Sequence, residues 1–342
     1  MSGKSGPDIV ENGLTLCLDA ANKRSYPVRN FVSAKIYSVY DGGLRSSNYT
    51  VQYSDDNSNW TTAFSGVASN NTSCGIQQNT GSGNGSYGFH RYWRYVEGSA
   101  VTLHHPRVSR IILTDINGSD YNLVVYTSDN CSDSGTYIVG TVSLDFGGTT
   151  WTDLSGLGNN GTLTNGPTFS AANMGSIVFD GSDDYVDCGN ASSLSITIGS
   201  VCVWFKKPHA GGYKGLVDKG RDNYGAWSLN VDETSNKATF KARISGNNRQ
   251  ITASSDYGNN AWTYVCGVYD GTTLSIYQNG IISNSASYSG TIDTNSVSVR
   301  IGAANDGLYF GGNVSNTKIY NRALTSQEIS QNFNATRSRF GI

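Results

Sequence analysis

Residues 318–329 read KIYNRALTSQEI, and this stretch decides the fold because a strand pattern changes into a helix start within it. Thr325 has the side chain of a good N-cap, and Glu328, three positions later, completes a capping box. Leu324 and Ile329 occupy the two positions of a hydrophobic staple. Almost no other part of the chain has a helical pattern, so we expect an all-β protein with one short C-terminal helix.

The segments before this helix alternate between apolar and polar residues and are separated by Gly, Asn, Asp and Ser. The pattern is clearest from residue 262 to residue 282, where Asp270-Gly271 and Asn279-Gly280 predict two hairpin turns. Further strands are expected at residues 176–180, 185–188, 201–205, 227–231, 238–244 and 297–301. Short strands at this spacing are typical of an antiparallel β-sandwich.

Composition limits the classes of function. The chain has 342 residues, of which 15% are charged, and a net charge of -2, so it lacks the basic surface expected of a protein that binds nucleic acid or anionic membranes. We find no apolar run long enough to span a membrane and no signal peptide, so synthesis in a cytoplasm is expected. The 41 glycines and 5 prolines fit many tight turns, and the length favours two domains.

The six cysteines give no clear disulfide pattern. Cys17, Cys202 and Cys266 lie in strand-like runs, and Cys188 ends a strand. Cys74 and Cys131 lie in polar loops. We expect buried free thiols, with a Cys74–Cys131 bridge as the alternative.

Four segments of the C-terminal part resemble the laminin-G-like members of the concanavalin A-like lectin/glucanase jelly rolls. They are TTWTDLSGLGNNGTLTNGPTF (149–169), SIVFDGSDDYVDCG (176–189), WTYVCGVYDGTTLSIYQNG (262–280) and KIYNRALTSQEISQNFNATR (318–337). Members of that family begin with a strand similar to NGLTLCLDAANKRSYP (12–27), which runs almost directly into the first of these segments. Here residues 28–146 intervene. The resemblance therefore implies a discontinuous sandwich of residues 1–27 and 147–342, interrupted by an inserted domain.

The insert, residues 28–146, has its own strand pattern, with strands expected at 49–53, 92–96, 108–113 and 121–126. The runs YTVQYSDDNSNWTTAFSG (49–66) and HRYWRYV (90–96) resemble the discoidin-type, galactose-binding-like jelly roll of coagulation-factor C-type domains. We interpret Arg94 as a structural partner of a buried carboxylate or carbonyl rather than a ligand-binding residue. Trp60 is interpreted as a plug in its turn rather than a stacking platform.

Two groups of side chains are candidate sites. Asp180, Asp183 and Asp184 can gather hard oxygen ligands for Ca²⁺, and laminin-G-like and pentraxin-like relatives hold calcium at the sandwich rim. The alternative is a pair of Asx turns that cap a hairpin.

The second group consists of tyrosines in turns rich in Gly and Asn. An aromatic ring in such a turn can stack on the apolar face of a sugar while neighbouring amides bind its hydroxyls. The alternative is that these rings cover a sandwich edge or pack in a subunit contact. The candidates are Tyr213, Tyr224, Tyr257 and Tyr309.

Catalysis is not expected. Laminarinase-type hydrolases of the same fold carry two glutamates on one strand, whereas the four glutamates here are far apart in the chain: Glu11, Glu97, Glu233 and Glu328. No nucleophile elbow, phosphate-binding loop or zinc-protease motif occurs.

The C-terminal stretch NRALTSQEISQNFNATRSRFGI is similar to the ends of virion proteins of tailed phages. This resemblance implies a non-enzymatic virion component, a capsid decoration or part of a tail fibre, present in many copies or as a homo-oligomer beside other virion proteins. Its loops would contact glycans on the host surface. The alternatives are a purely architectural virion subunit and a glycoside hydrolase.

Overall fold

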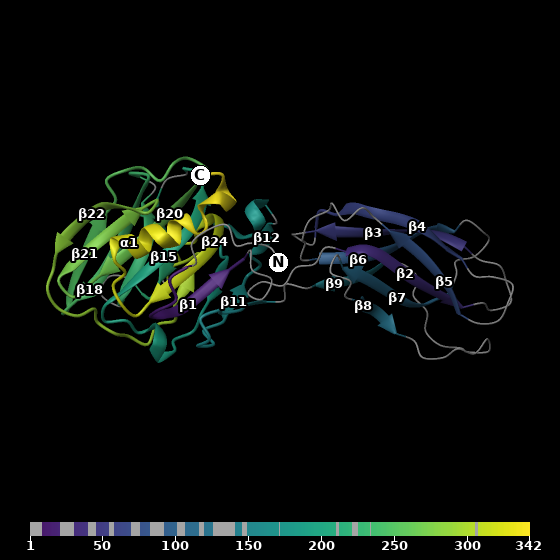
Figure 1. Cartoon of the computed structure of the whole chain (residues 1–342), viewed down its shortest axis with the longest axis horizontal. Helices are drawn as coiled ribbons and strands as arrows, with labels where there is room; N and C mark the ends of the chain where they lie inside the picture. Colours follow the sequence, from purple (N-terminus) through teal and green to yellow (C-terminus); the bar gives the residue numbers. More distant parts are fainter. Residues whose placement is uncertain are drawn as a thin grey trace. The chain divides into compact units, whose positions relative to one another are not determined.

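The computed structural model describes residues 9–20, 31–39, 46–54, 58–69, 76–82, 92–100, 107–115, 120–125, 141–145, 149–170, 172–209, 212–220, 225–232, 234–304 and 307–342 (Figure 1). Contacts divide the chain into two compact units, residues 1–26 with 149–342 (unit 1) and residues 27–148 (unit 2).

Unit 1 is a sandwich of two eight-stranded antiparallel sheets. The first sheet has the order β12-β13-β24-β15-β20-β21-β22, and β1 also pairs with β24. Its strands are β1 (Leu14–Asp19), β12 (Thr168–Ser170), β13 (Ser176–Asp180), β15 (Gly199–Lys207), β20 (Ala261–Tyr269), β21 (Thr273–Gln278), β22 (Ile281–Ser287) and β24 (Gly311–Tyr320).

The second sheet of unit 1 has the order β10-β11-β14-β23-β16-β17-β18-β19. Its strands are β10 (Thr150–Trp151), β11 (Gly161–Thr164), β14 (Tyr185–Asp187), β23 (Arg300–Ile301), β16 (Tyr213–Asp218), β17 (Trp227–Asp232), β18 (Lys237–Ile244) and β19 (Asn247–Thr252). The described helical segments are η1 (Ala172–Met174), η2 (Ser192–Leu194), α1 (Ser326–Asn334) and η4 (Arg337–Phe340). The predicted all-β jelly-roll class with one short C-terminal helix is confirmed, and the fold is that of a concanavalin A-like β-sandwich.

The interior of the sandwich follows from strand alternation. Residues that lie directly opposite one another on neighbouring strands point to the same face. One such row in the second sheet is buried throughout and consists of Leu163, Val186, Ile301, Val217, Leu229, Phe240 and Ile251. From the first sheet, Gly267 lies so close to the Phe240 ring that an added Cβ would collide with it. The two sheets therefore meet at this row.

Helix α1 covers the outer face of the first sheet, which is the face turned away from the second sheet (Figure 1). The Trp204 ring of β15 stacks between Phe333 at 5.5 Å and Phe340 at 4.2 Å, and its indole donates to Thr336 at 2.9 Å. The predicted capping box is present, because the Glu328 amide donates to the Thr325 hydroxyl and the Thr325 amide donates to the Glu328 carboxylate. The staple residues Leu324 and Ile329 are buried in the same cluster.

The N-terminal strand belongs to unit 1. Strand β1 pairs with β24, the last strand of the chain. The loop after β10 fixes β1 further, because the buried Asp153 carboxylate accepts from the amides of Cys17, Ser155 and Asn159 at 2.9 to 3.0 Å. This network gives a structural role to the DLSGLGNN segment.

One expectation about the cysteines is wrong. Cys202 of β15 and Cys266 of β20 form a disulfide, because the strand register places them directly opposite each other. Cys17 and Cys188 are buried free thiols, and burial raises the pKa of the Cys17 thiol to about 11. Cys74 and Cys131 lie outside the described residues.

Unit 2 contains two four-stranded antiparallel sheets, ordered β5-β2-β7-β8 and β4-β3-β6-β9. Ala34, Tyr49, Val51, Trp93 and Leu113 are buried in it. Its strands are β2 (Phe31–Val39), β3 (Ser46–Ser54), β4 (Thr61–Ser69), β5 (Ile76–Ser82), β6 (Tyr92–Ala100), β7 (Arg107–Asp115), β8 (Asp120–Val125) and β9 (Thr141–Asp145). Within the described parts of both units, no helix has the length and apolar character needed to cross a membrane.

Candidate functional site

The outer face of the second sheet of unit 1 is polar. Strand register places one row of side chains on it, opposite the buried apolar row: Asp187, Arg300, Asp218, Ser228, Lys241 and Gln250. We call this surface the polar face. Asp218 and Ser228 in the middle of the row are fully buried, whereas Gln250 at its end is exposed.

The larger hollow of the polar face has a volume of about 520 Å³ and lies over β11 and β14. It is lined by Gly158, Asn159, Asn160, Thr162, Thr164, Asp187, Cys188, Gly189, Asn190 and Ala191. Asn160 accepts through Oδ1 from the Asp153 amide, and Asn190 accepts through Oδ1 from the Lys219 ammonium at 2.7 Å. Both amides are thereby oriented, and their Nδ2 groups can donate to a ligand.

Two ionisable side chains, Asp187 and Lys219, lie at or next to this hollow. Asp187 accepts from the Gly189 amide through Oδ1 at 2.8 Å, which leaves Oδ2 as an acceptor at the hollow. Lys219 is fully buried, and burial lowers its pKa; it also donates to the Val297 carbonyl at 2.9 Å. The hollow thus combines oriented donors with a carboxylate, the set of groups that binds sugar hydroxyls.

A smaller hollow of about 120 Å³ lies over β17, β18 and β19. It is lined by Gly220, Gly225, Ala226, Trp227, Ser228, Lys241, Ala242, Arg243, Asn248, Arg249 and Gln250. Arg243 pairs with Asp293 at 3.0 Å, so this cation is already neutralised.

Two tyrosines lie on the polar face, and each has a cation over its ring. Arg300 lies 4.7 Å from the ring centroid of Tyr185, and Lys241 lies 4.7 Å from that of Tyr213. Both rings are half-buried. Sequence reasoning missed Tyr185, although its alternation with Val186 on a predicted strand could have identified it as an outward-facing aromatic residue.

The structure does not bring the four predicted tyrosines into one site. Tyr213 lies on the polar face, and Tyr309 lies half-buried in the loop whose Leu308 carbonyl accepts from the Gly215 amide at 3.0 Å. Tyr224 lies outside the described residues.

The expectation of an exposed ring is wrong for Tyr257. Its residue is only 2% exposed, because the ring packs against Phe205 at 5.4 Å and His209 at 5.0 Å. Burial raises the pKa of the Tyr257 hydroxyl to about 12. A turn rich in Gly and Asn can therefore direct an aromatic residue into the end of the core.

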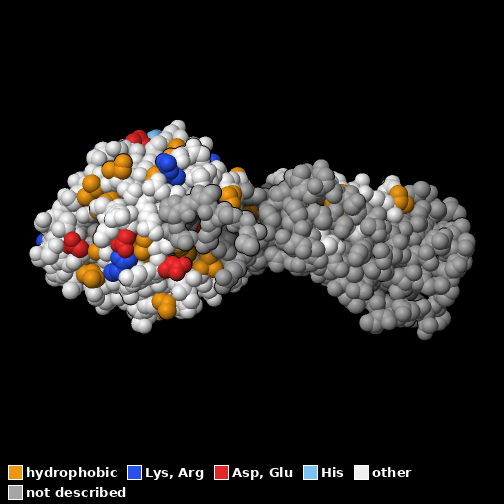
Figure 2. All heavy atoms as spheres, viewed as in Figure 1, with side chains coloured by type: hydrophobic (Ala, Val, Ile, Leu, Met, Phe, Trp, Pro, Cys, Tyr) orange, Lys and Arg blue, Asp and Glu red, His pale blue; other side chains and the backbone are white. Residues whose placement is uncertain are grey.

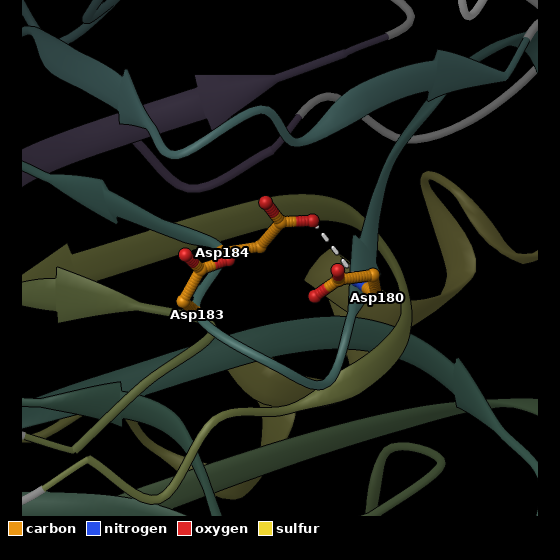
Figure 3. Close-up of side chains that lie close together, drawn as sticks. All are labelled: Asp180, Asp183 and Asp184. Carbon is orange, nitrogen blue, oxygen red and sulfur yellow. Dashed lines mark hydrogen bonds between the residues drawn. The ribbon is translucent and has the colours of Figure 1, made fainter.

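The three predicted metal ligands do lie together. Carboxylate oxygens of Asp180, at the end of β13, and of Asp183 and Asp184, in the loop before β14, are within 4.8 Å of one another (Figure 3). Asp184 is buried and accepts from the Asp180 amide at 2.9 Å, and Asp180 accepts from the Ser182 amide at 2.7 Å. The predicted Asx turn is therefore also present at Asp180.

The spacing of these oxygens fits one Ca²⁺ ion, whose ligands lie about 2.3–2.6 Å from the metal. Burial, with smaller contributions from the neighbouring Asp180 and Asp183, raises the pKa of Asp184 to about 6. A bound cation would oppose this shift.

The visible charges do not gather into a patch of one sign. Figure 2 shows separate acidic and basic side chains on the face of unit 1 that carries α1.

The fold is that of a concanavalin A-like sandwich, and the outer side of its second sheet is polar. Residues 180–330 match the profile of the family described as the concanavalin A-like lectin/glucanases superfamily. No match was found among curated proteins.

Solved structures with a similar fold include the binding domain of Paraclostridial Mosquitocidal Protein 1, at 18% identity and a TM-score of 0.46 over 54% of this chain and 49% of that chain. The botulinum neurotoxin serotype D binding domain matches at 13% identity and a TM-score of 0.44, over 53% and 48% of the two chains. The chain thus spans about half the length of these structures.

Domain 4 of AbnA, a GH43 extracellular arabinanase from Geobacillus stearothermophilus, in complex with arabinotriose, matches at 16% identity and a TM-score of 0.43, over 54% of this chain and 92% of that chain. At these identities the likenesses concern the fold alone.

Proposed function

We propose that this protein is a non-enzymatic adhesion protein that binds glycans at the larger hollow of the polar face. One observation carries the proposal: Asn160 and Asn190 present oriented amide donors beside the Asp187 carboxylate, and Tyr185 follows on the same face. A hollow of about 520 Å³ accommodates a mono- or disaccharide.

The proposed setting is a virion, as a capsid decoration or a tail-fibre component among other virion proteins. The resemblance of the C-terminal stretch to tailed-phage proteins supports this setting. Weak binding at each hollow would be offset by many copies on one particle, each contacting glycans of the host surface.

A glycan array followed by calorimetry on the full chain tests the binding proposal. Asp187→Asn keeps the acceptor for the Gly189 amide but removes the charge, and Tyr185→Ala removes the ring. Each variant should weaken binding about tenfold or more. Asp270→Asn, at a hairpin turn of the first sheet, is the matched control and should leave affinity unchanged.

The rival functions give different results. A blank array from a protein that still assembles on capsids would establish a purely architectural subunit. Release of reducing ends from polysaccharide, lost in Asp183→Ala or Asp184→Ala, would establish a hydrolase. Either result would overturn the proposal.

We further propose that the Asp180, Asp183 and Asp184 loop binds Ca²⁺, supported by the 4.8 Å grouping of its oxygens. Calorimetric titration with CaCl₂ should show one site, and Asp183→Asn should weaken it at least tenfold. Identical thermograms and melting temperatures with CaCl₂ and with EDTA would show that the loop is only an Asx-turn cap.

A further inference from the structure

The loop of residues 152–160, between β10 and β11, serves two parts of unit 1 at once. It binds β1, the strand after which the chain enters unit 2 at Pro27. It also lines the larger hollow of the polar face through Gly158, Asn159 and Asn160. One loop therefore contains both the clamp on β1 and part of the proposed ligand site.

The clamp acts on the edge of β1 that is turned away from β24. The Cys17 amide donates to Asp153 Oδ1 at 2.9 Å, and the Cys17 carbonyl accepts from the Leu154 amide at 2.8 Å. The Thr15 carbonyl accepts from Asn159 Nδ2 at 2.6 Å. Backbone groups on the edge of a sheet need such partners or water, so the loop replaces water along this part of β1.

The Asp153 carboxylate joins the clamp to the hollow. Asp153 is 7% exposed, and it accepts from the amides of Cys17, Ser155 and Asn159 and from Ser155 Oγ, at distances between 2.6 and 3.0 Å. The Asp153 amide in turn donates to Asn160 Oδ1 at 2.9 Å, which leaves Asn160 Nδ2 as a donor at the hollow. Hydrogen bonds to a buried carboxylate are strong, so this one side chain fixes the loop.

Asn159 gives a second connection between β1 and the hollow. It is buried, and its Nδ2 group donates to Ser193 Oγ of η2 at 3.0 Å as well as to the Thr15 carbonyl. The residues just before η2, Asn190 and Ala191, line the same hollow. Release of β1 would therefore free Asn159 and loosen the lining on both segments.

We propose that Asp153 is a positioning residue that couples the larger hollow to β1. The donors of the hollow are oriented only while β1 is docked, so ligand binding and docking of the strand stabilise each other. This inference rests on the proposed function, because it concerns the same ligand site. An edge strand can open locally without global unfolding. A ligand that binds only the docked form suppresses this opening by a factor of 1 + [L]/Kd, and the linkage is reciprocal.

The first test needs no ligand. Asp153→Asn is nearly isosteric, but its Nδ2 group cannot accept from the amides that the carboxylate holds. In ¹H–¹⁵N spectra of the full chain, this variant should shift the Asn160 side-chain signals and speed hydrogen exchange of the Cys17 amide about tenfold or more. Asp270→Asn is the matched control, because Asp270 also accepts from two backbone amides but lies in a turn of the first sheet. It should change neither signal.

Ser155→Ala serves if Asp153→Asn does not fold. It removes only the hydroxyl that donates to Asp153 Oδ2 and to the Thr15 carbonyl. The same two signals should change in the same directions, by smaller amounts.

The second test adds lactose, cellobiose or mannobiose to the full chain, with affinities measured by calorimetry. A disaccharide that binds, at about 100 times its Kd, should slow exchange of the Cys17 amide up to about 100-fold. Asp153→Asn should weaken its affinity about tenfold. Tyr185→Ala lacks the ring of the proposed site but keeps the network, so at the same disaccharide concentration the protection of Cys17 should be smaller.

Two results would overturn the coupling: an Asp153→Asn protein in which β1 is loosened while the Asn160 signals stay in place, or a bound disaccharide that leaves exchange of Cys17 unchanged. If no disaccharide binds, the proposed function fails for these sugars, and the ligand-free test still decides whether Asp153 positions Asn160. Failure of the proposed function is therefore distinguishable from failure of the coupling.

Discussion

A shift of one position along a strand decides whether a side chain of this protein lies in the core or on the surface. Tyr185 lies on the polar face beside the larger hollow, and the next residue, Val186, is fully buried between the sheets. Tyr257 shows the opposite outcome, because its loop turns the ring inward against Phe205. Exposure of loop tyrosines thus depends on the loop path, which composition does not encode.

Tyr257→Ala should lower the free energy of unfolding by about 3–5 kcal/mol, because it removes a fully buried ring from the end of the core. Glycan affinity should be unchanged once the variant is folded. Urea denaturation followed by circular dichroism measures the first effect. A loss below about 1 kcal/mol would mean that the ring is dispensable for the core.

At the scale of elements, the start of α1 combines a cap, an ion pair and an apolar contact within residues 322–333. Glu328 accepts from Arg322 in two hydrogen bonds of 2.9 and 2.7 Å while it also caps the helix. The hydrogen bond from Arg322, followed by the bonds from Thr325, lowers the pKa of Glu328 from 4.5 to about 2. The helix terminus is therefore stabilised by the charged form of Glu328.

Glu328→Gln should lower the free energy of unfolding at pH 7 by about 1–2 kcal/mol. Because the folded pKa of Glu328 is depressed, its stabilisation is complete above pH 4.5 and disappears as the pH falls through about 2. The difference between the variant and the unchanged protein should shrink over that interval. Denaturation curves at pH 7, 4 and 2.5 measure it, and a constant difference would contradict this account.

The elements were predictable to different degrees. The capping box, the Asn279-Gly280 turn and the long strands were visible because their signals lie within a few residues of each other. The alternation predicted over 297–301 became only the two-residue strand β23. The polar face was not predictable, because its row joins six strands whose order in the sheet differs from their order in the sequence.

At the scale of the whole molecule, the disulfide depended on tertiary register. Cys202 and Cys266 are 64 positions apart and meet only because β15 and β20 pair in one register. The local sequence places Cys202 and Cys266 in strands, but it contains nothing that selects this pairing over other pairings of the six cysteines. The grouping of Asp180, Asp183 and Asp184, in contrast, was predictable because all three lie within five consecutive positions of the sequence.

Cys266→Ala should lower the free energy of unfolding by about 2–4 kcal/mol, because the bridge closes a long loop in the unfolded chain. Cys188→Ala removes a buried free thiol and serves as the control, with a smaller loss. Thermal melting with and without reductant measures both. Insensitivity of the unchanged protein to reductant would show that the bridge does not form in solution.

Deleting residues 28–146 and joining Pro27 to Gly147 should leave a soluble sandwich that melts cooperatively. The reason is that β1 pairs with β24 and is held by Asp153, both within unit 1. Calorimetry of the shortened chain gives the answer. Aggregation, or a broad transition without a heat peak, would mean that unit 1 depends on the insert.

The pairing of β1 with β24 also sets an order of events during synthesis. The Tyr320 hydroxyl donates to the Val10 carbonyl across 310 positions of chain, so β1 leaves the ribosome long before its partner β24 is made. Unit 2 emerges complete long before that partner exists and is free to fold meanwhile. A nascent chain truncated before β24 would therefore carry a folded unit 2 and an incomplete unit 1. The apolar side of β1 would then be exposed to chaperones.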